Sequence, residues 1–189
     1  FNMESPMVGG YAPAEVALRR AIALAMNSER EAMQLRKGQA KVTDTPILPF
    51  TGGYDLVKHS EFGEYDPARA KGLLDTFGYL DRDGDGWRER PDGSPLVLEV
   101  ATQSDQAQRG LDELFKKNMD AIGVRTTFKV AQCPENLKAA RSGKFMIWPL
   151  AVSAAGLDGL GTFAKYDSNQ IGGQNMARFK LPEMDEIYR

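Results

Sequence analysis

The chain has 189 residues, of which 42% are hydrophobic and 26% are charged, and these proportions are ordinary for a globular protein. Its formal net charge of -2 gives no long-range field that would attract nucleic acid or an anionic membrane, so neither partner is expected. The single cysteine, Cys133, excludes an internal disulfide and a cysteine-rich metal site. No apolar run approaches the roughly 20 residues that a membrane span requires.

In chain order, the first expected helix begins at Pro13 and has one apolar face. That face is formed by Leu18, Ala21, Ile22, Ala25 and Met26. Ser28 and Glu31 have the spacing of a capping box, which predicts a second short helix that begins there and ends at Gly38. Residues 40–63 are rich in Thr, Pro and Gly, and they are expected to form a long loop.

The next block predicts a helix, a tight acidic turn and a strand. Asp66 stands where a helix N-cap belongs, Pro67 follows at the first helical position, and Gly78 ends the helix. The acidic turn covers Asp81–Trp87. The strand is indicated by the alternating apolar residues Leu96, Leu98 and Val100.

Two further helix–strand pairs follow. Ser104 or Asp105 can cap a long helix that ends at Gly123, and residues 124–130 then alternate as a half-buried strand. A helix from Pro134 precedes residues 145–152, whose nearly continuous apolar run is typical of a strand covered on both faces. The order β-α-β-α-β predicts an α/β fold with helices packed on a mainly parallel sheet and right-handed connections.

The C-terminal part is glycine-rich and is expected to be irregular from Ser153 to Phe179. A helix begins near Pro182, with the first residues of an apolar stripe at Met184 and Ile187, but only about two turns of it are present. The chain is therefore expected to be a piece of a longer protein, and a natural frayed C-terminus is the alternative.

The acidic turn resembles the start of a calcium loop. Asp81, Asp83 and Asp85 place oxygens at alternate positions, and Gly86 stands at the sixth position. The twelfth position is Asp92, and the prolines and glycines around it forbid a following helix. The alternatives are a weak calcium site, the one cofactor suggested by the sequence, and a turn held by local side-chain-to-backbone bonds.

Catalysis finds little support in the sequence. His59, the single histidine, lies in the expected long loop, and no G-x-S-x-G motif is present. Cys133 has no histidine near it in the sequence. The protein is therefore expected not to be an enzyme, and a His59→Ala variant is expected to keep its function.

Ligands of open α/β layers bind at the loops that follow the carboxyl ends of parallel strands. Three such loops are expected here, at residues 102–106, 131–134 and 149–158. Their neutral hydrogen-bonding groups belong to Thr102, Gln103, Ser104 and Ser153. Trp148 lies in the apolar run before the third loop, where a tryptophan packs in the core or stacks on a ligand. These residues define a candidate binding face, and plain surface loops are the alternative.

Several segments together resemble a known family. They are Val16–Asn27, which looks like its "RRAIALAID-R" helix, Tyr65–Leu74, like its "YDPEKAKELL" helix, Asp81–Glu89, like its "DGDGWRE" turn, Leu114–Val124 and Gly143–Phe145. The family is the extracellular solute-binding proteins of peptide, dipeptide and nickel ABC transporters. The resemblance implies that residues 1–189 form a single periplasmic-binding-protein type II-like lobe. It would be most of the second, C-terminal lobe of two that close on a solute. It also implies export to the periplasm, delivery of a small-molecule or peptide solute to a membrane permease, and a monomer.

The chain departs from the family pattern at two places. An aromatic-x-Ala-Asp motif, whose acid holds the amino terminus of a bound peptide, falls on residues 152–155, and Ala155 stands at the acid position. A family tryptophan falls at Cys133. The departures imply that the usual anchor for a free α-amine is absent. Asp158 is the nearest remaining acid and joins the candidate ligand-binding residues.

Overall fold

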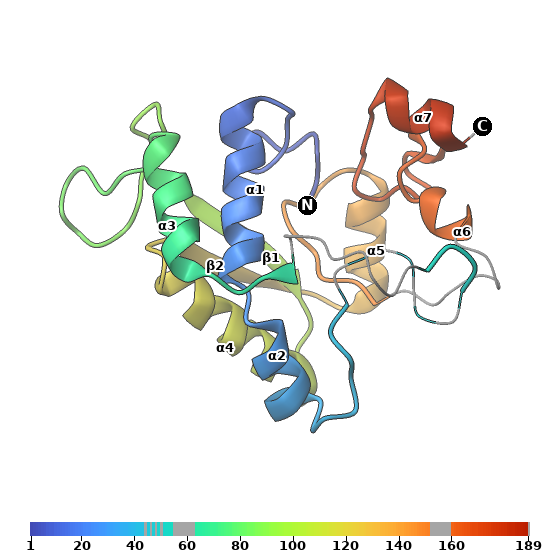
Figure 1. Ribbon diagram of the computed structural model, residues 1–189, viewed down its shortest axis with the longest axis horizontal. Coiled ribbons are helices and arrows are strands. Elements are labelled where there is room, and N and C mark those ends of the chain that lie inside the picture. The colour runs from blue at the N-terminus through green and yellow to red at the C-terminus, as the bar shows by residue number, and fades with distance from the viewer. Residues whose placement is uncertain are drawn as a thin grey trace.

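The computed structural model describes residues 1–43, 45, 47, 49, 51–54, 63–151 and 160–188 (Figure 1). Its longer elements are α1 Pro13–Ala25, α3 Pro67–Thr76, β1 Val97–Thr102, α4 Gln106–Asp120, β2 Arg125–Val130, α5 Cys133–Arg141 and α7 Pro182–Tyr188. The short ones are α2 Ser28–Arg30, the π-helical turn η1 Glu31–Leu35, α6 Leu160–Phe163 and the 3-10 turn η3 Ser168–Gln170. Among the described helices, none combines the length and the apolar character needed to cross a bilayer.

Aspartate side chains cap the starts of α3 and α4. The Asp66 carboxylate accepts a hydrogen bond from the Arg69 N–H at 2.9 Å, which confirms the predicted cap of α3. At α4 the cap is Asp105, whose Oδ1 accepts from the Gln108 N–H at 2.9 Å, so the alternative cap Ser104 is wrong. Each cap satisfies a backbone N–H that has no partner inside the helix.

The second predicted helix forms, but with a different start. Its cap is Asn27, whose Oδ1 accepts from the Arg30 N–H at 2.9 Å, because Ser28 is already the first helical residue. The segment then widens into the π-helical turn η1. Gly38 follows with a φ of +73°, a left-handed conformation that suits glycine, so the predicted end of this segment is confirmed.

The two strands predicted at residues 96–100 and 124–130 lie in one sheet and run parallel, as expected. Val97 is opposite Arg125, and the register continues to Thr102 opposite Val130, with α4 as the crossover. At its end β2 departs from the expected alternation, because Val130 is 60% exposed where the strand leaves the core.

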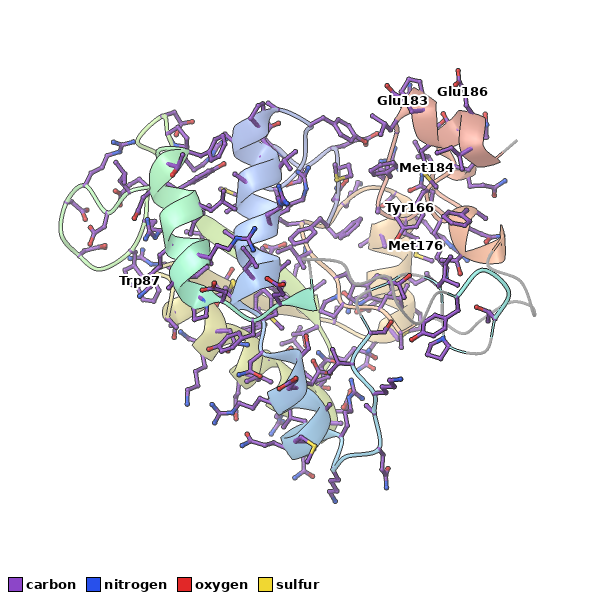
Figure 2. All side chains as sticks on the ribbon, in the orientation of Figure 1. Trp87, Tyr166, Met176, Glu183, Met184 and Glu186 are labelled. Carbon is purple, nitrogen blue, oxygen red and sulfur yellow. The ribbon has the colours of Figure 1, made fainter. Side chains whose placement is uncertain are left out.

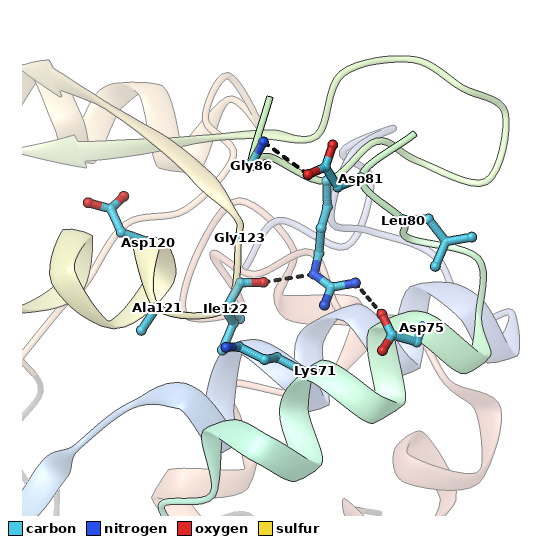
Figure 3. A pocket seen from close by; sticks show the side chains of 10 residues that line it. Lys71, Asp75, Leu80, Asp81, Gly86, Asp120, Ala121, Ile122 and Gly123 are labelled. Atoms are coloured by element: carbon cyan, nitrogen blue, oxygen red, sulfur yellow. Dashed lines mark hydrogen bonds and ion pairs between the residues drawn. The ribbon is translucent and has the colours of Figure 1, made fainter. Parts of the chain in front are cut away.

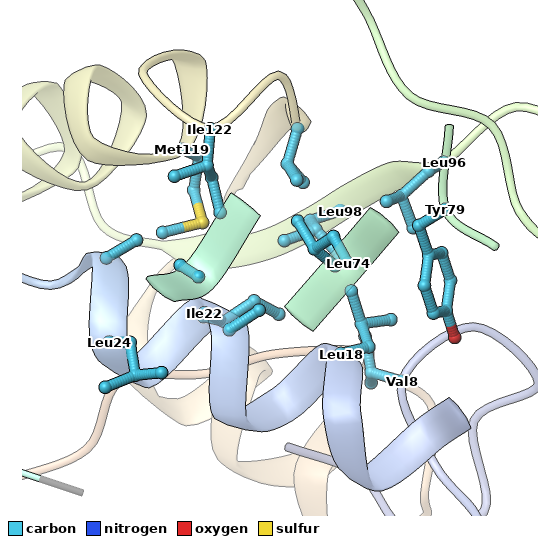
Figure 4. Packing of buried hydrophobic residues seen from close by; sticks show 14 of the residues in the cluster. Val8, Leu18, Ile22, Leu24, Leu74, Tyr79, Leu96, Leu98, Met119 and Ile122 are labelled. Atoms are coloured by element: carbon cyan, nitrogen blue, oxygen red, sulfur yellow. The ribbon is translucent and has the colours of Figure 1, made fainter. Parts of the chain in front are cut away.

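The hydrophobic core lies between β1 and the helices α1, α3 and α4 (Figures 1 and 4). Helices α1 and α3 are in contact along their lengths and lie side by side over the sheet. The largest fully buried side chains of this core are Val8, Leu18, Leu74, Leu96, Leu98, Val100, Met119, Ile122 and Val124. The predicted apolar face of α1 is buried here, with Met26 half-buried at its end.

The third predicted strand, residues 145–152, is wrong within its described part. Only Ile147 pairs with β1, as an isolated parallel bridge to Val100. The Ala101 N–H donates to the Ile147 carbonyl at 2.8 Å, and the Ile147 N–H donates to the Glu99 carbonyl at 3.2 Å. The β-α-β-α-β order is therefore realised as two strands and one bridged residue, with β1 in the middle.

The side chains and backbone around this bridge explain why the ladder stops. The Glu99 N–H donates to the thioether sulfur of Met146 at 3.2 Å, where a longer strand would offer a carbonyl. Two residues beyond Ile147, Pro149 has no N–H to give to a ladder. The run is not covered on both faces either, since Leu150 is 43% exposed.

The C-terminal part is more regular than expected, because it contains α6 and η3. It is organised by Asn175, which is fully buried. The Asn175 Nδ2 donates to the carbonyls of Asp167 at 2.9 Å and Phe179 at 2.7 Å, and its Oδ1 accepts from the Phe179 N–H at 3.0 Å. These three side-chain hydrogen bonds satisfy backbone groups that would otherwise pair within a longer helix or strand.

Candidate functional site

A groove of about 530 Å³ lies at the carboxyl end of β1. Its walls come from the first half of α4, the η1 segment, the start of α5 and residues 148–151. The polar and charged lining residues are Glu31, Arg36, Gln103, Asp105, Gln108 and Asp112, and the large apolar or aromatic ones are Met26, Leu111, Phe115, Trp148 and Leu150. The groove thus occupies the edge at which the sequence predicts ligand binding.

The carboxylate of Asp112 is fixed in this groove by two neutral donors. The Thr102 hydroxyl donates to its Oδ2 at 2.5 Å, and the Gln108 Nε2 donates to its Oδ1 at 3.0 Å. Thr102 is only 2% exposed and ends β1, so the strand itself sets the position of this carboxylate. Two such hydrogen bonds hold the carboxylate in a defined orientation.

The ends of the two strands are joined beside the groove. The buried Asn136 of α5 donates from Nδ2 to the Thr102 carbonyl at 3.0 Å, and the Ala131 N–H donates to the same carbonyl at 3.0 Å. Cys133, the first residue of α5, is exposed and lines the groove. Side chains from both crossover helices, Asp112 of α4 and Asn136 of α5, therefore hydrogen-bond to the end of β1.

The residues that the sequence singled out take different places. Gln103 and Trp148 are half-buried and line the groove. Thr102 is buried and acts on the groove through Asp112, while Ser104 is exposed and lies outside the lining. Outside the described residues lie His59, Ser153, Ala155 and Asp158.

The described wall of the groove is acidic. Glu31 and Arg36 pair with each other at 3.2 Å. Asp105 and Asp112 have no Lys or Arg within ion-pair distance in the part of the chain that the structure describes. With three acids and one base among the described lining residues, the wall has a net charge of -2.

Sequence reasoning missed Gln108 and Asp112. Both lie on α4 at an i, i+4 spacing, so they share one face of that helix. A polar pair at this spacing, one turn inside a helix that follows a buried strand end, is the signal that identifies them.

Comparison with known proteins places the chain in a family. A sequence model described as bacterial extracellular solute-binding proteins, family 5 Middle, matches residues 1–174. The chain belongs to this family. A search of curated proteins gives no match.

Solved structures of family 5 and related binding proteins show the same fold. The oligopeptide-binding protein AppA of Bacillus subtilis, solved with a nonapeptide, has a TM-score of 0.84 at 18% identity, covering 100% of this chain and 36% of AppA. NikZ of Campylobacter jejuni, solved with Ni(L-His), has a TM-score of 0.81 at 20% identity, with coverage of 100% and 36%.

A third neighbour is an oligopeptide-binding protein of Thermotoga maritima solved with mannohexaose. Its TM-score is 0.78 at 21% identity, covering 96% of this chain and 36% of that protein. The expected type II-like fold is therefore confirmed. The chain spans about a third of the length of these family 5 neighbours.

The acidic turn of this family 5 chain gathers four carboxylates. One oxygen from each of Asp81, Asp83, Asp85 and Glu89 lies within 4.8 Å of the others, which corresponds to positions 1, 3, 5 and 9 of a calcium loop. Asp92, the expected twelfth position, instead accepts from the Ser94 N–H and hydroxyl. These two hydrogen bonds lower the pKa of Asp92, and the bond from the Ser94 hydroxyl has the larger effect.

The same turn is also held by the local bonds of the alternative interpretation. The two oxygens of Asp81 accept from the N–H groups of Gly84 at 2.8 Å and Gly86 at 2.9 Å, and Asp85 accepts from the Trp87 N–H at 2.8 Å. The second oxygen of Asp85 pairs with Arg125 at 3.0 Å. Calcium binding here stays a prediction.

A second hollow, of about 520 Å³, lies between this turn and the ends of α3 and α4 (Figure 3). Arg88 runs through it and joins its walls. Its guanidinium donates to the carbonyls of Ile122 at 2.8 Å and Tyr79 at 2.6 Å, and to the Asp75 carboxylate at 2.5 Å. Arg88 therefore links the end of the acidic turn to α3, through Asp75, and to the segments that follow α3 and α4, so it has a structural role.

A third, more apolar hollow of about 310 Å³ lies on the far side of Trp148. Its lining includes Phe1, Phe145, Tyr166 and Met176, the last two of which are side by side in Figure 2. Burial raises the pKa of the Tyr166 phenol. Trp148 borders both this hollow and the groove, so it is available to a ligand in either one.

Proposed function

We propose that this chain is one lobe of a two-lobed solute-binding protein that serves an ABC importer. In this proposal the groove at the end of β1 contributes one side of the solute site, and a facing lobe contributes the other. The closed protein then carries a small-molecule or peptide solute to a membrane permease. Export to the periplasm and action as a monomer are parts of the same proposal.

The observation that carries the proposal is the groove at the strand ends in a chain that belongs to family 5. Its lining combines large apolar side chains with a few fixed polar groups, which is the usual composition of a small-molecule site. Family 5 neighbours were solved with a peptide, a nickel complex and a sugar, so the fold admits chemically different solutes.

The proposed role needs no catalytic step. Affinity in such a clamp comes from burying the solute between the lobes and from hydrogen bonds that closure shields from water. Gln103 and Trp148, which line the groove, are the proposed contacts of this lobe, and Thr102 orients the Asp112 carboxylate in the same groove. Ser104, Ser153 and Asp158 remain candidate contacts from the sequence.

A thermal-shift screen of the full-length protein tests the proposal. The panel contains peptides, opines, sugars and metal chelates, and at least one class is expected to raise the melting temperature by mass action. The protein with Trp148→Leu is expected to lose much of that shift, whereas the matched variant Trp87→Leu, which changes the acidic turn, is expected to keep it. The proposal fails if no class stabilises the protein.

Calorimetry on the isolated 189-residue chain provides a second test. One lobe offers only half of the surface that a closed clamp buries, so the isolated chain is expected to bind the same solute weakly or not at all. Equal affinity for the isolated chain and the full-length protein would show that the site is complete in this lobe, and the clamp would be the wrong description.

A further inference from the structure

We infer that the solute carries an ammonium or guanidinium group and that Asp112 receives this group in the groove. The inference rests on the proposed function and adds the chemical class of the solute to it. It follows from three properties of the described wall, namely the state of the Asp112 carboxylate, the charge balance, and the aromatic surface beside it.

The carboxylate of Asp112 is oriented but not neutralised. Its two oxygens accept from Thr102 and Gln108, which are uncharged donors. A carboxylate oxygen has two lone pairs, so each oxygen of Asp112 keeps one acceptor site for a further donor. A half-buried carboxylate is stabilised most by a donor that is itself positively charged.

The charge balance of the wall favours the same kind of group. Arg36 is the single base among the described lining residues, and it is paired with Glu31. Asp105 adds a second carboxylate about two helical turns from Asp112, and Gln108 hydrogen-bonds to both. Its N–H donates to Asp105 at 2.9 Å, and its side chain donates to Asp112. An anionic solute would meet two negative charges here, and a cation would relieve their repulsion.

The aromatic and apolar lining suits the rest of such a solute. Trp148 and Phe115 are half-buried in the groove, and an aromatic face attracts an organic cation through its ring quadrupole. Met26 and Leu111 provide apolar wall for a carbon chain. The groove therefore combines a carboxylate that can accept from a cationic group with an apolar surface that can pack against the hydrocarbon part of the same solute.

The test compares matched pairs of solutes and matched variants of the full-length protein. The probes are agmatine, spermidine and lysine amide, each beside its N-acetylated form, which keeps the skeleton and has one positive charge fewer. Asp112→Asn keeps the shape of the side chain and an acceptor oxygen but removes the charge. Glu113→Gln, an exposed neighbour on the same helix outside the groove lining, is the control.

At least one charged probe is expected to bind more tightly than its acetylated form in calorimetry. Asp112→Asn is expected to weaken that binding by about tenfold or more, as expected for a charge-assisted hydrogen bond, and Glu113→Gln by less than about twofold. Melting curves without solute establish that Asp112→Asn is folded. If it is not, Asp105→Asn takes its place, because asparagine is an equally good N-cap, and a loss of about two- to fivefold is expected.

Two results would overturn the inference and leave the proposed function intact. In one, the stabilising solutes in the wider panel are all neutral or anionic. In the other, a cationic solute binds equally well to wild type and Asp112→Asn. If no solute of any class binds, both the inference and the proposed function fail.

Discussion

Replacing Arg88 by methionine is expected to lower the free energy of unfolding by about 3–5 kcal/mol. The Arg88 side chain is 12% exposed, and it donates to two backbone carbonyls, those of Tyr79 just after α3 and Ile122 just after α4. Hydrogen bonds from a charged donor contribute about 1.5–3 kcal/mol each. The pair with Asp75, which is 54% exposed, adds less than about 1 kcal/mol because water screens it.

The matched control is Arg82→Met in the same turn. Arg82 also donates to two carbonyls, those of Gly78 at 3.0 Å and Pro91 at 3.4 Å, but it is exposed, so water replaces its bonds. Differential scanning calorimetry is expected to show a melting temperature about 10 °C lower for Arg88→Met and nearly unchanged for Arg82→Met. Equal melting temperatures for the two variants would refute the structural role assigned to Arg88.

Three further outcomes are expected. Asn175→Ala should destabilise the protein by about 2 kcal/mol, since it leaves the N–H and the carbonyl of the half-buried Phe179 without their side-chain partner, while the exposed neighbour variant Gln174→Ala should stay within about 0.5 kcal/mol in urea unfolding. Burial raises the pKa of Tyr166 above its ordinary value of 10.0, so the folded state loses stability as pH rises from there. The melting temperature of wild type should then fall more steeply above pH 10 than that of Tyr166→Phe. Excess calcium should shift the melting temperature by less than about one degree if Asp81 and its neighbours form only a local turn, and a larger rise, absent in Asp81→Asn, would establish a metal site.

Much of the fold was predictable because its helices are defined by local chemistry. A cap such as Asp66 acts on an N–H three residues away, and a left-handed glycine such as Gly78 ends a helix by its own backbone freedom. These interactions lie within a few residues of sequence, so the sequence pattern contains them. The exact cap is harder to predict. Asp105 rather than Ser104 caps α4, and Asn27 rather than the predicted Ser28 caps α2, because both members of each pair have a suitable oxygen.

The third strand was not predictable from its apolar run. Whether residues 145–148 extend a ladder depends on what lies beside them in space, and some of the groups that hold these residues come from far away in the chain. Asn2 donates from its backbone N–H to the Met146 carbonyl at 2.9 Å and from its side chain to the Phe145 carbonyl at 2.8 Å. A contact across more than 140 residues leaves no periodic signal, so the same apolar pattern serves a strand or an anchored loop.

The groove shows the same division between local and distant determinants. Its place followed from topology, because parallel strands joined by helices must bring their carboxyl ends to one edge. Its charge did not, since the role of Asp112 depends on the hydroxyl of Thr102, ten residues away on another element. The strand residue that seemed the direct contact is buried, and the helix residue that it orients faces the groove. In the proposed site, the side chain at the strand end acts by positioning a neighbour, and the inferred solute class follows from the charge of that neighbour.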